Sequence, residues 1–260
     1  MAEGLLVRAT APAVLTLTLD RPAQGNGLTP ALLREIQAAL DQAEATTACR
    51  MVVLEGRDGV FSTGMDFEQA AAEDGGSDGG AAFLALLERL TRLPRVVVAK
   101  VDGRAAGGGV GLAVACDFVF ATERSQFSLP EALWGLLPCC VLPFLIRRVG
   151  FQKAYAMTLA TLPIGAAEAE RIHLVDQRTE DPDEPIRRLA FRLSKIDPTT
   201  LGRAKRHFCS LWSLSPEVER AALAELAELM ASPLVRRNIA AFVRERKLPW
   251  ETSPPGDPTR

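Results

Sequence analysis

The sequence predicts an α/β fold followed by a helical C-terminal region, and three observations support this. Short apolar runs typical of buried strands occur at residues 14–19, 50–56 and 95–103. Segments with helical periodicity alternate with them. After residue 130 the pattern becomes mostly helical. With 260 residues, 48% of them hydrophobic, the chain can build one large core with a helical appendage.

The first elements have clear local signals. The run "VLTLTL" at 14–19 alternates apolar residues with threonine, which predicts a half-buried strand. A helix should follow, because Thr29 is a good N-cap and Pro30 suits the first helical position. Its apolar residues recur at helical spacing: Leu32, Leu33, Ile36, Leu40 and Ala43. The stretch Glu73–Ala81 contains four glycines and predicts a mobile loop.

The C-terminal helices start near residue 196. Ser215 and Pro216 form an N-cap and first-turn pair before a long helical pattern. We therefore divide the chain into an α/β core at residues 1–195 and a helical region with a short tail at 196–260.

Charge and cysteine content narrow the function classes. A net charge of −2 argues against nucleic acid as the main partner. The five cysteines show no metal-ligand spacing, so we expect no metal site. Their odd number and scattered positions fit a reducing environment, so we expect a cytoplasmic location. No apolar run is long enough to cross a membrane, and the first residues do not resemble a signal peptide.

Three consecutive glycines, Gly107–Gly109, follow a predicted strand and open an apolar helix. A helix N-terminus exposes unpaired N–H groups, and glycine lets a ligand approach that backbone closely. The spacing matches neither a P-loop nor a dinucleotide-binding motif. Taken alone, this motif equally fits close packing of a helix on a strand.

A second strand–turn–helix pattern, "VFSTGMDFEQ" at 60–69, changes that balance. Two such turns can direct one backbone N–H each at a common point. This is how an oxyanion hole for a thioester carbonyl can be built. The candidate donors are the N–H groups of Met65 and Gly108.

At this point the chain resembles the crotonase (enoyl-CoA hydratase/isomerase) superfamily. The matching pieces keep their order over residues 5–180: "LDRPAQGNGL", "FSTGMDF", "VDGRAAGGGVGLAVACDFVFATERSQFSLPE" and "GLLP". The resemblance implies a spiral of ββα units, a helical C-terminal region, and a homotrimer or hexamer. It also implies an acyl-thioester substrate whose enolate is held by Met65 and Gly108. The pocket residues it implies are Gly64, Gly107, Gly111 and Trp134.

Hydratases of this superfamily use two glutamates, and this chain retains one of them. The first position is Gly111 here, and the second is Glu131 in "SLPEALWG". Glu131 is therefore the main acid–base candidate, since burial among apolar residues would raise its pKa. Asp66 could supply the second proton function. A helix N-cap is at least as good an interpretation of Asp66.

Residues 135–164 and the "LPWE" at 248–251 resemble a narrower group, the dehydratases of polyketide β-branching cassettes of the HMG-CoA synthase type. Those lyases remove water from a 3-hydroxy-3-methylglutaryl group on an acyl carrier protein. The decarboxylases of the same cassettes lack the glutamate found here as Glu131. No cofactor is implied beyond the phosphopantetheine or CoA that carries the thioester.

An acidic carrier protein should dock on basic residues. One candidate cluster is Arg147, Arg148 and Lys153, and the other is Arg203, Lys205 and Arg206, although such faces are often simply solvated. Two other functions stay open. One is hydration or isomerisation of ordinary acyl-CoA with Glu131 alone, and the other is a non-catalytic homologue that binds thioesters.

Overall fold

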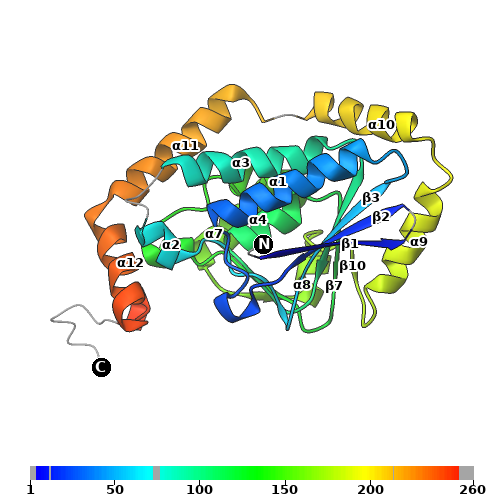
Figure 1. Cartoon of the computed structure of the whole chain (residues 1–260). Coiled ribbons are helices and arrows are strands. Elements are labelled where there is room, and N and C mark those ends of the chain that lie inside the picture. The colour runs from blue at the N-terminus through cyan, green and yellow to red at the C-terminus, as the bar shows by residue number, and fades with distance from the viewer. Residues whose placement is uncertain (1–3, 12, 73–76, 213, 252–260) are drawn as a thin grey trace.

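The structure is a computed structural model that describes residues 4–11, 13–72, 77–212 and 214–251. Helices lie over two mainly parallel sheets (Figure 1). The larger sheet has the order β1-β2-β3-β5-β7-β10, in which only β1 is antiparallel to its neighbour. Its strands are β1 (Leu5–Ala11), β2 (Val14–Leu19), β3 (Met51–Gly56), β5 (Val96–Val101), β7 (Phe118–Ala121) and β10 (Gln177–Arg178).

The smaller sheet has the order β4-β6-β8-β9. Its strands are β4 (Val60–Ser62), β6 (Arg104–Ala106), β8 (Gln126–Ser128) and β9 (Ile164–Gly165). Strands β4, β6 and β8 run parallel, whereas β9 is antiparallel to β8.

Twelve α-helices and two 3₁₀ turns complete the described residues. The helices are α1 (Pro30–Ala45), α2 (Phe67–Ala72), α3 (Ser77–Arg92), α4 (Gly108–Ala115), α5 (Glu131–Trp134), α6 (Leu142–Val149), α7 (Phe151–Ala160), α8 (Ala166–Arg171), α9 (Asp183–Leu193), α10 (Pro198–Leu211), α11 (Pro216–Ala231) and α12 (Pro233–Glu245). The 3₁₀ turns are η1 (Pro22–Gln24) and η2 (Pro249–Glu251).

The chain repeats a strand–strand–helix unit, which confirms the expected spiral. In each unit the first strand joins the larger sheet and the second joins the smaller one. The units are β3–β4 followed by α2 and α3, then β5–β6 followed by α4, then β7–β8 followed by α5. Each turn of the spiral therefore places a helix start next to the smaller sheet.

Several sequence expectations agree with the structure. Thr29 Oγ1 accepts a hydrogen bond from Leu32 N at the start of α1, and Ser215 Oγ accepts one from Val218 N at the start of α11. Residues 14–19 do form a strand, but the half-buried expectation is wrong, because all six residues of β2 are buried. Helix α1 packs against β2 in the main core, and Val14 at its start joins the separate cluster formed with helices α9 and α10.

The expected loop at 73–81 is also partly wrong. Residues 73–76 lie outside the described residues, but α3 begins at Ser77 and runs through Gly79 and Gly80. A Cβ at Gly80 would lie 2.7 Å from Leu226 Cδ2 of α11. Gly80 therefore lets α11 pack closely on α3.

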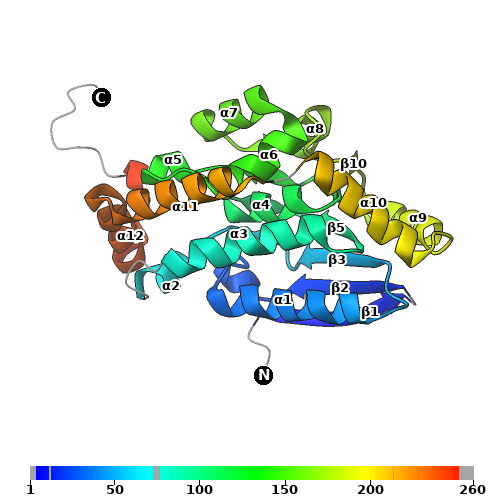
Figure 2. The same cartoon turned by 90° about the horizontal axis from the view of Figure 1, so that it is seen from above.

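The boundary expected at 195/196 falls between α9 and α10. Helices α9 and α10 cover one face of the larger sheet through Ile186, Leu193 and Leu201. Figure 2 shows that α10 and α12 lie at opposite ends of α11. No described helix is both long and apolar enough to cross a membrane.

Candidate active site

Three loops meet at one edge of the smaller sheet. Met65 follows β4, Gly108 follows β6, and Glu131 follows β8. These strands are parallel neighbours, so their carboxyl ends lie side by side, where ligands bind in open α/β sheets. The topology therefore brings together the three residues that the sequence singles out.

The amide of Met65 has no internal acceptor among the described residues. Leu28 N donates to Gly64 O at 2.8 Å, and Asp66 N donates to Leu28 O at 3.3 Å. In this parallel bridge Leu28 occupies both groups that flank Met65. The N–H of Met65 consequently points to the opposite side, away from Leu28.

Gly108 is the first residue of α4, so its N–H has no partner within the helix. No hydrogen bond joins it to another described residue. The two turns are in direct contact, because a Cβ at Gly64 would lie only 2.7 Å from Gly108 N. Gly64 also has φ +85°, a left-handed conformation that glycine adopts without strain. Glycine at 64 is thus required for the close approach of the two amides.

Glu131 completes the group from the third loop. A Cβ at Gly107 would lie 3.0 Å from Glu131 Oε1, so the carboxyl group sits directly beside the glycine turn. Glu131 Oε2 is buried and has no hydrogen-bond partner among the described residues. Burial raises the pKa of Glu131 to about 7, against a smaller lowering by its own backbone N–H. Such a carboxyl group can both accept and donate a proton near neutral pH.

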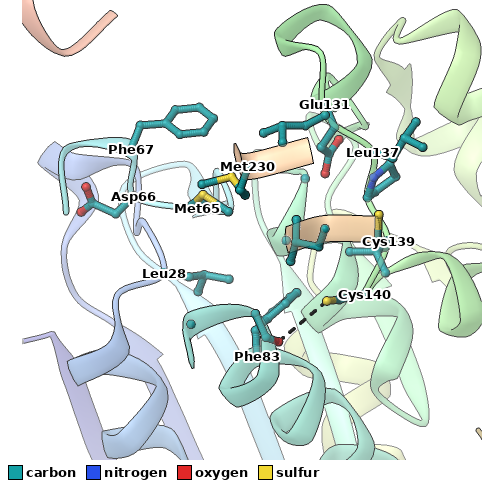
Figure 3. Close-up of a pocket in the computed structure, with 18 of the residues that line it drawn as sticks. Leu28, Met65, Asp66, Phe67, Phe83, Glu131, Leu137, Cys139, Cys140 and Met230 are labelled. Atoms are coloured by element: carbon teal, nitrogen blue, oxygen red, sulfur yellow. Dashed lines mark hydrogen bonds between the residues drawn. The ribbon is translucent and has the colours of Figure 1, made fainter. Parts of the chain in front are cut away.

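These groups face a cavity of about 200 Å³ whose walls are mainly apolar (Figure 3). Met65, Gly107, Gly108, Glu131 and Trp134 all line it. Further walls come from α3 and from α11, including Phe83, Leu226 and Met230, which the sequence analysis did not identify. The apolar residues of α11 recur at helical spacing, which indicates a buried face. The sequence does not show that this face lines the pocket, because that depends on how the C-terminal helices pack on the core.

Comparison with known proteins agrees with this geometry. Residues 9–253 match the Enoyl-CoA hydratase/isomerase family. The chain belongs to this family. It is 34% identical to the bacillaene synthase dehydratase PksH of Bacillus subtilis, over 92% of this chain and 93% of that protein. It is 33% identical to a probable enoyl-CoA hydratase of Rhizobium meliloti, over 94% of this chain and 96% of that protein.

A solved structure from B. subtilis, described as a putative polyketide biosynthesis enoyl-CoA hydratase (pksH), superimposes with a TM-score of 0.88 at 32% identity. The match covers 94% of this chain and 98% of that one. The chain is thus a hydro-lyase of the enoyl-CoA hydratase/isomerase family, and its substrate class is an acyl thioester.

This family member cannot hold a second glutamate at residue 111 in the present packing. A Cβ at Gly111 would lie 2.8 Å from Val141 Cγ2 and 3.1 Å from Phe83 Cζ. The expectation that Gly111 and Gly64 line the pocket is wrong, since neither contributes to its wall. Val141 and Phe83 cover Gly111, and Gly64 packs against Gly108. Apolar groups therefore occupy the place of the missing acid.

Asp66 also lines the cavity, and its contacts favour the N-cap interpretation over a role as second acid. Its Oδ1 accepts a hydrogen bond from Gln69 N at 3.2 Å, as an N-cap of α2. Its Oδ2 pairs with Arg21 Nη2 at 3.2 Å. In Figure 3 the Asp66 carboxylate points away from Glu131, with Met65 between them. Both Asp66 oxygens are engaged, whereas Glu131 Oε2 has no partner among the described residues, which makes Glu131 the stronger candidate for proton transfer.

The pocket holds no lysine, arginine or histidine among the described residues that line it. Nor do the described residues form a His/Cys/Asp/Glu group suited to a metal ion. Cys139 and Cys140 line the wall as buried thiols, and burial raises the pKa of Cys139 to about 11 and that of Cys140 to about 12. At neutral pH both are therefore apolar wall residues rather than nucleophiles.

Lys205 is not a surface residue, so its assignment to a carrier-binding cluster is wrong. Its side chain is 9% exposed, and Nζ pairs with Asp117 Oδ2 at 2.7 Å. It also donates to the carbonyl oxygens of Leu90 and Arg95, both at 3.1 Å. Lys205 fastens α10 to the core, and only Arg203 and Arg206 of that cluster are exposed.

The other cluster is also structural in part. Arg147 Nη2 donates to Val114 O at 3.2 Å, and its guanidinium lies 4.7 Å from the centre of the Trp212 ring. Arg148 donates to Leu174 O at 2.9 Å and pairs with Asp176. These arginines hold α6 against the core and are not free for a partner.

Proposed function

We propose that this protein removes water from a 3-hydroxy-3-methylglutaryl group on an acyl carrier protein and so produces the 3-methylglutaconyl thioester. The likeness to a bacillaene synthase dehydratase supports this substrate class. The observation that carries the proposal is the meeting of one buried carboxyl group, whose Oε2 has no partner among the described residues, with two acceptor-free amides at a mainly apolar cavity.

The proposed reaction uses the two amides first. The thioester oxygen accepts hydrogen bonds from Met65 N–H and Gly108 N–H, which stabilises the negative charge that develops there. Ionised Glu131 then takes the α-proton, and the electron pair of that C–H bond moves to give the enolate.

In the second step the enolate forms the α,β double bond while the bond from the β-carbon to the hydroxyl breaks. Protonated Glu131 returns its proton to the departing hydroxyl, which leaves as water. The carboxyl group ends in its starting state. Because one carboxyl group, Glu131, serves both steps in this proposal, the proton and the hydroxyl leave from the same face of the substrate. The tertiary β-carbon eases departure of the hydroxyl, which is consistent with a site that has one acid.

The proposal includes no metal and no cofactor other than the phosphopantetheine of the substrate.

We also propose that the protein assembles as a homotrimer or hexamer. Large apolar side chains exposed on and beside α7 support self-association: Phe151, Tyr155, Leu159 and Leu162. Sedimentation velocity measures the assembly directly, and a monomer at micromolar concentration would contradict that part.

Mass spectrometry of the loaded carrier tests the reaction. We expect the 3-hydroxy-3-methylglutaryl group to lose the mass of one water after the protein is added. An unchanged mass, with the protein folded, would contradict the proposal.

A second candidate is hydration of an uncharged enoyl-CoA. The observation that favours it is the absence of a cationic side chain among the described pocket residues, since a distal carboxylate would find no counter-ion there. Turnover of crotonyl-CoA, combined with inactivity on the carrier-bound group, would select it.

A further inference from the structure

Helix α12 carries three arginines and no acidic residue on one exposed face. Arg236, Arg237 and Arg244 are separated by one, seven and eight positions, which places them within a sector of about 100° on an α-helix. All three are exposed. The opposite side of α12 buries Val235 and Ile239 against the core. We call Arg236, Arg237 and Arg244 the arginine face.

The arginine face keeps most of its positive charge unpaired, although Arg244 attracts the neighbouring Glu245. None of its members forms an ion pair with a described residue, although Arg244 Nε donates to Ala240 O at 3.3 Å. The neighbouring acids are engaged elsewhere, since Glu68 pairs with Arg246 and Glu245 pairs with Lys247. The whole chain carries a net charge of −2, so the positive charge of the arginine face contrasts with the slightly negative charge of the protein as a whole.

The side of α12 opposite the arginine face packs beside the pocket. Phe67 and Trp134 both line the cavity, and both contact Phe242 of α12, with ring centres 6.1 and 5.3 Å apart. Met65, which carries one of the two amides, is 38% exposed at this end. Figure 1 shows α12 beside α2, the helix that follows Met65. A carrier held on the arginine face would therefore be separated from the site by the width of this helix, about 10 Å.

We propose that the arginine face is the docking surface for the acidic carrier protein whose phosphopantetheine arm delivers the thioester. The inference rests on the proposed function, because it requires a carrier-bound substrate. Opposite charge speeds association and orients the partner. Exposed Glu225 and Glu228 on the adjoining α11 repel an acidic partner, which confines it to α12.

The test is charge reversal of the face with a matched control. The variant Arg236→Glu/Arg237→Glu/Arg244→Glu is compared with Arg203→Glu/Arg206→Glu on α10. The same acyl group is supplied on the carrier and as a free pantetheine thioester. For the α12 variant we expect kcat/KM for the carrier-bound substrate to fall about tenfold or more, mainly because KM rises. This fall should be smaller at high salt, because salt screens the charges. With the pantetheine thioester it should stay within about twofold for both variants.

A second readout separates docking from catalysis. Binding of the acyl-free phosphopantetheinyl carrier is measured by calorimetry for wild type and both variants, with sedimentation to record their assembly. The α12 variant should lose carrier affinity while the α10 variant keeps it. Equal affinity in wild type and the α12 variant, or a loss confined to the α10 variant, would overturn the inference.

A change of assembly with unchanged carrier affinity would also overturn it, because the face would then be a contact between copies. If the α12 variant does not fold, Arg236→Gln/Arg237→Gln/Arg244→Gln replaces it with the same expectations. Failure of the proposed function appears differently, as wild-type protein that binds the carrier but removes no water from its acyl group.

Discussion

Replacing Glu131 with glutamine should change how stability depends on pH. The pKa of Glu131 is raised from 4.5 to about 7 by burial. The folded protein therefore holds this proton more tightly than the unfolded chain does. Wild-type stability relative to the variant is then greatest below about pH 4.5 and falls as the pH rises through about 7.

The size of the effect follows from the two pKa values. A difference of about 2.5 pKa units corresponds to about 3 kcal/mol of unfolding free energy, and most of it is lost between pH 5 and pH 8. Glutamine cannot ionise, so the variant lacks this pH dependence. Its absolute stability also includes the cost of a buried amide, so the pH dependence of the difference is the quantity to measure.

Urea denaturation of wild type and Glu131→Gln at half-unit pH intervals provides that measurement. We expect the variant to gain about 2–3 kcal/mol relative to wild type between pH 5 and pH 8. Parallel curves for the two proteins would refute the reasoning, because they would show that the carboxyl group ionises as it does in water.

The other predictions concern the neighbouring residues. Gly64→Ala should lower kcat about 10²-fold, because its Cβ would lie 2.7 Å from Gly108 N and separate the two amides; Gly150→Ala, with a similar positive φ but open space, is the control and should stay near wild type in steady-state assays. Lys205→Met should lower the free energy of unfolding by about 3 kcal/mol, measured in urea, since Asp117 loses a buried partner; a change below about 0.5 kcal/mol would contradict the anchoring role. Asp66→Asn keeps an N-cap oxygen, so its kcat should fall far less than the roughly 10²-fold of a lost acid–base group; a larger fall would return Asp66 to the proton-transfer chemistry.

Sequence patterns predicted the parts of the site that depend on local signals. The positions of Met65, Gly108 and Glu131 follow from strand–turn–helix motifs, each of which is short and continuous in the chain. Helix caps such as Thr29 are likewise local, and they were predicted correctly.

The parts that depend on distant contacts could not be predicted in this way. Lys205 has the sequence environment of a surface helix, yet it is buried because Asp117, 88 positions earlier, lies beneath it. The closing of the space next to Gly111 depends on Val141 and Phe83, which come from two other elements. The sequence analysis did not single out the arginines of α12, and the position of this helix beside the pocket depends on the packing of Phe242 on Trp134.

The most direct test of a single acid acting beside two amides is the rate at which carrier-bound 3-hydroxy-3-methylglutaryl loses water, followed by mass spectrometry with wild type and Glu131→Gln. Our account predicts that wild type removes one water and that the variant, still folded, is slower by about 10²- to 10⁴-fold. Equal rates for the two proteins would contradict it.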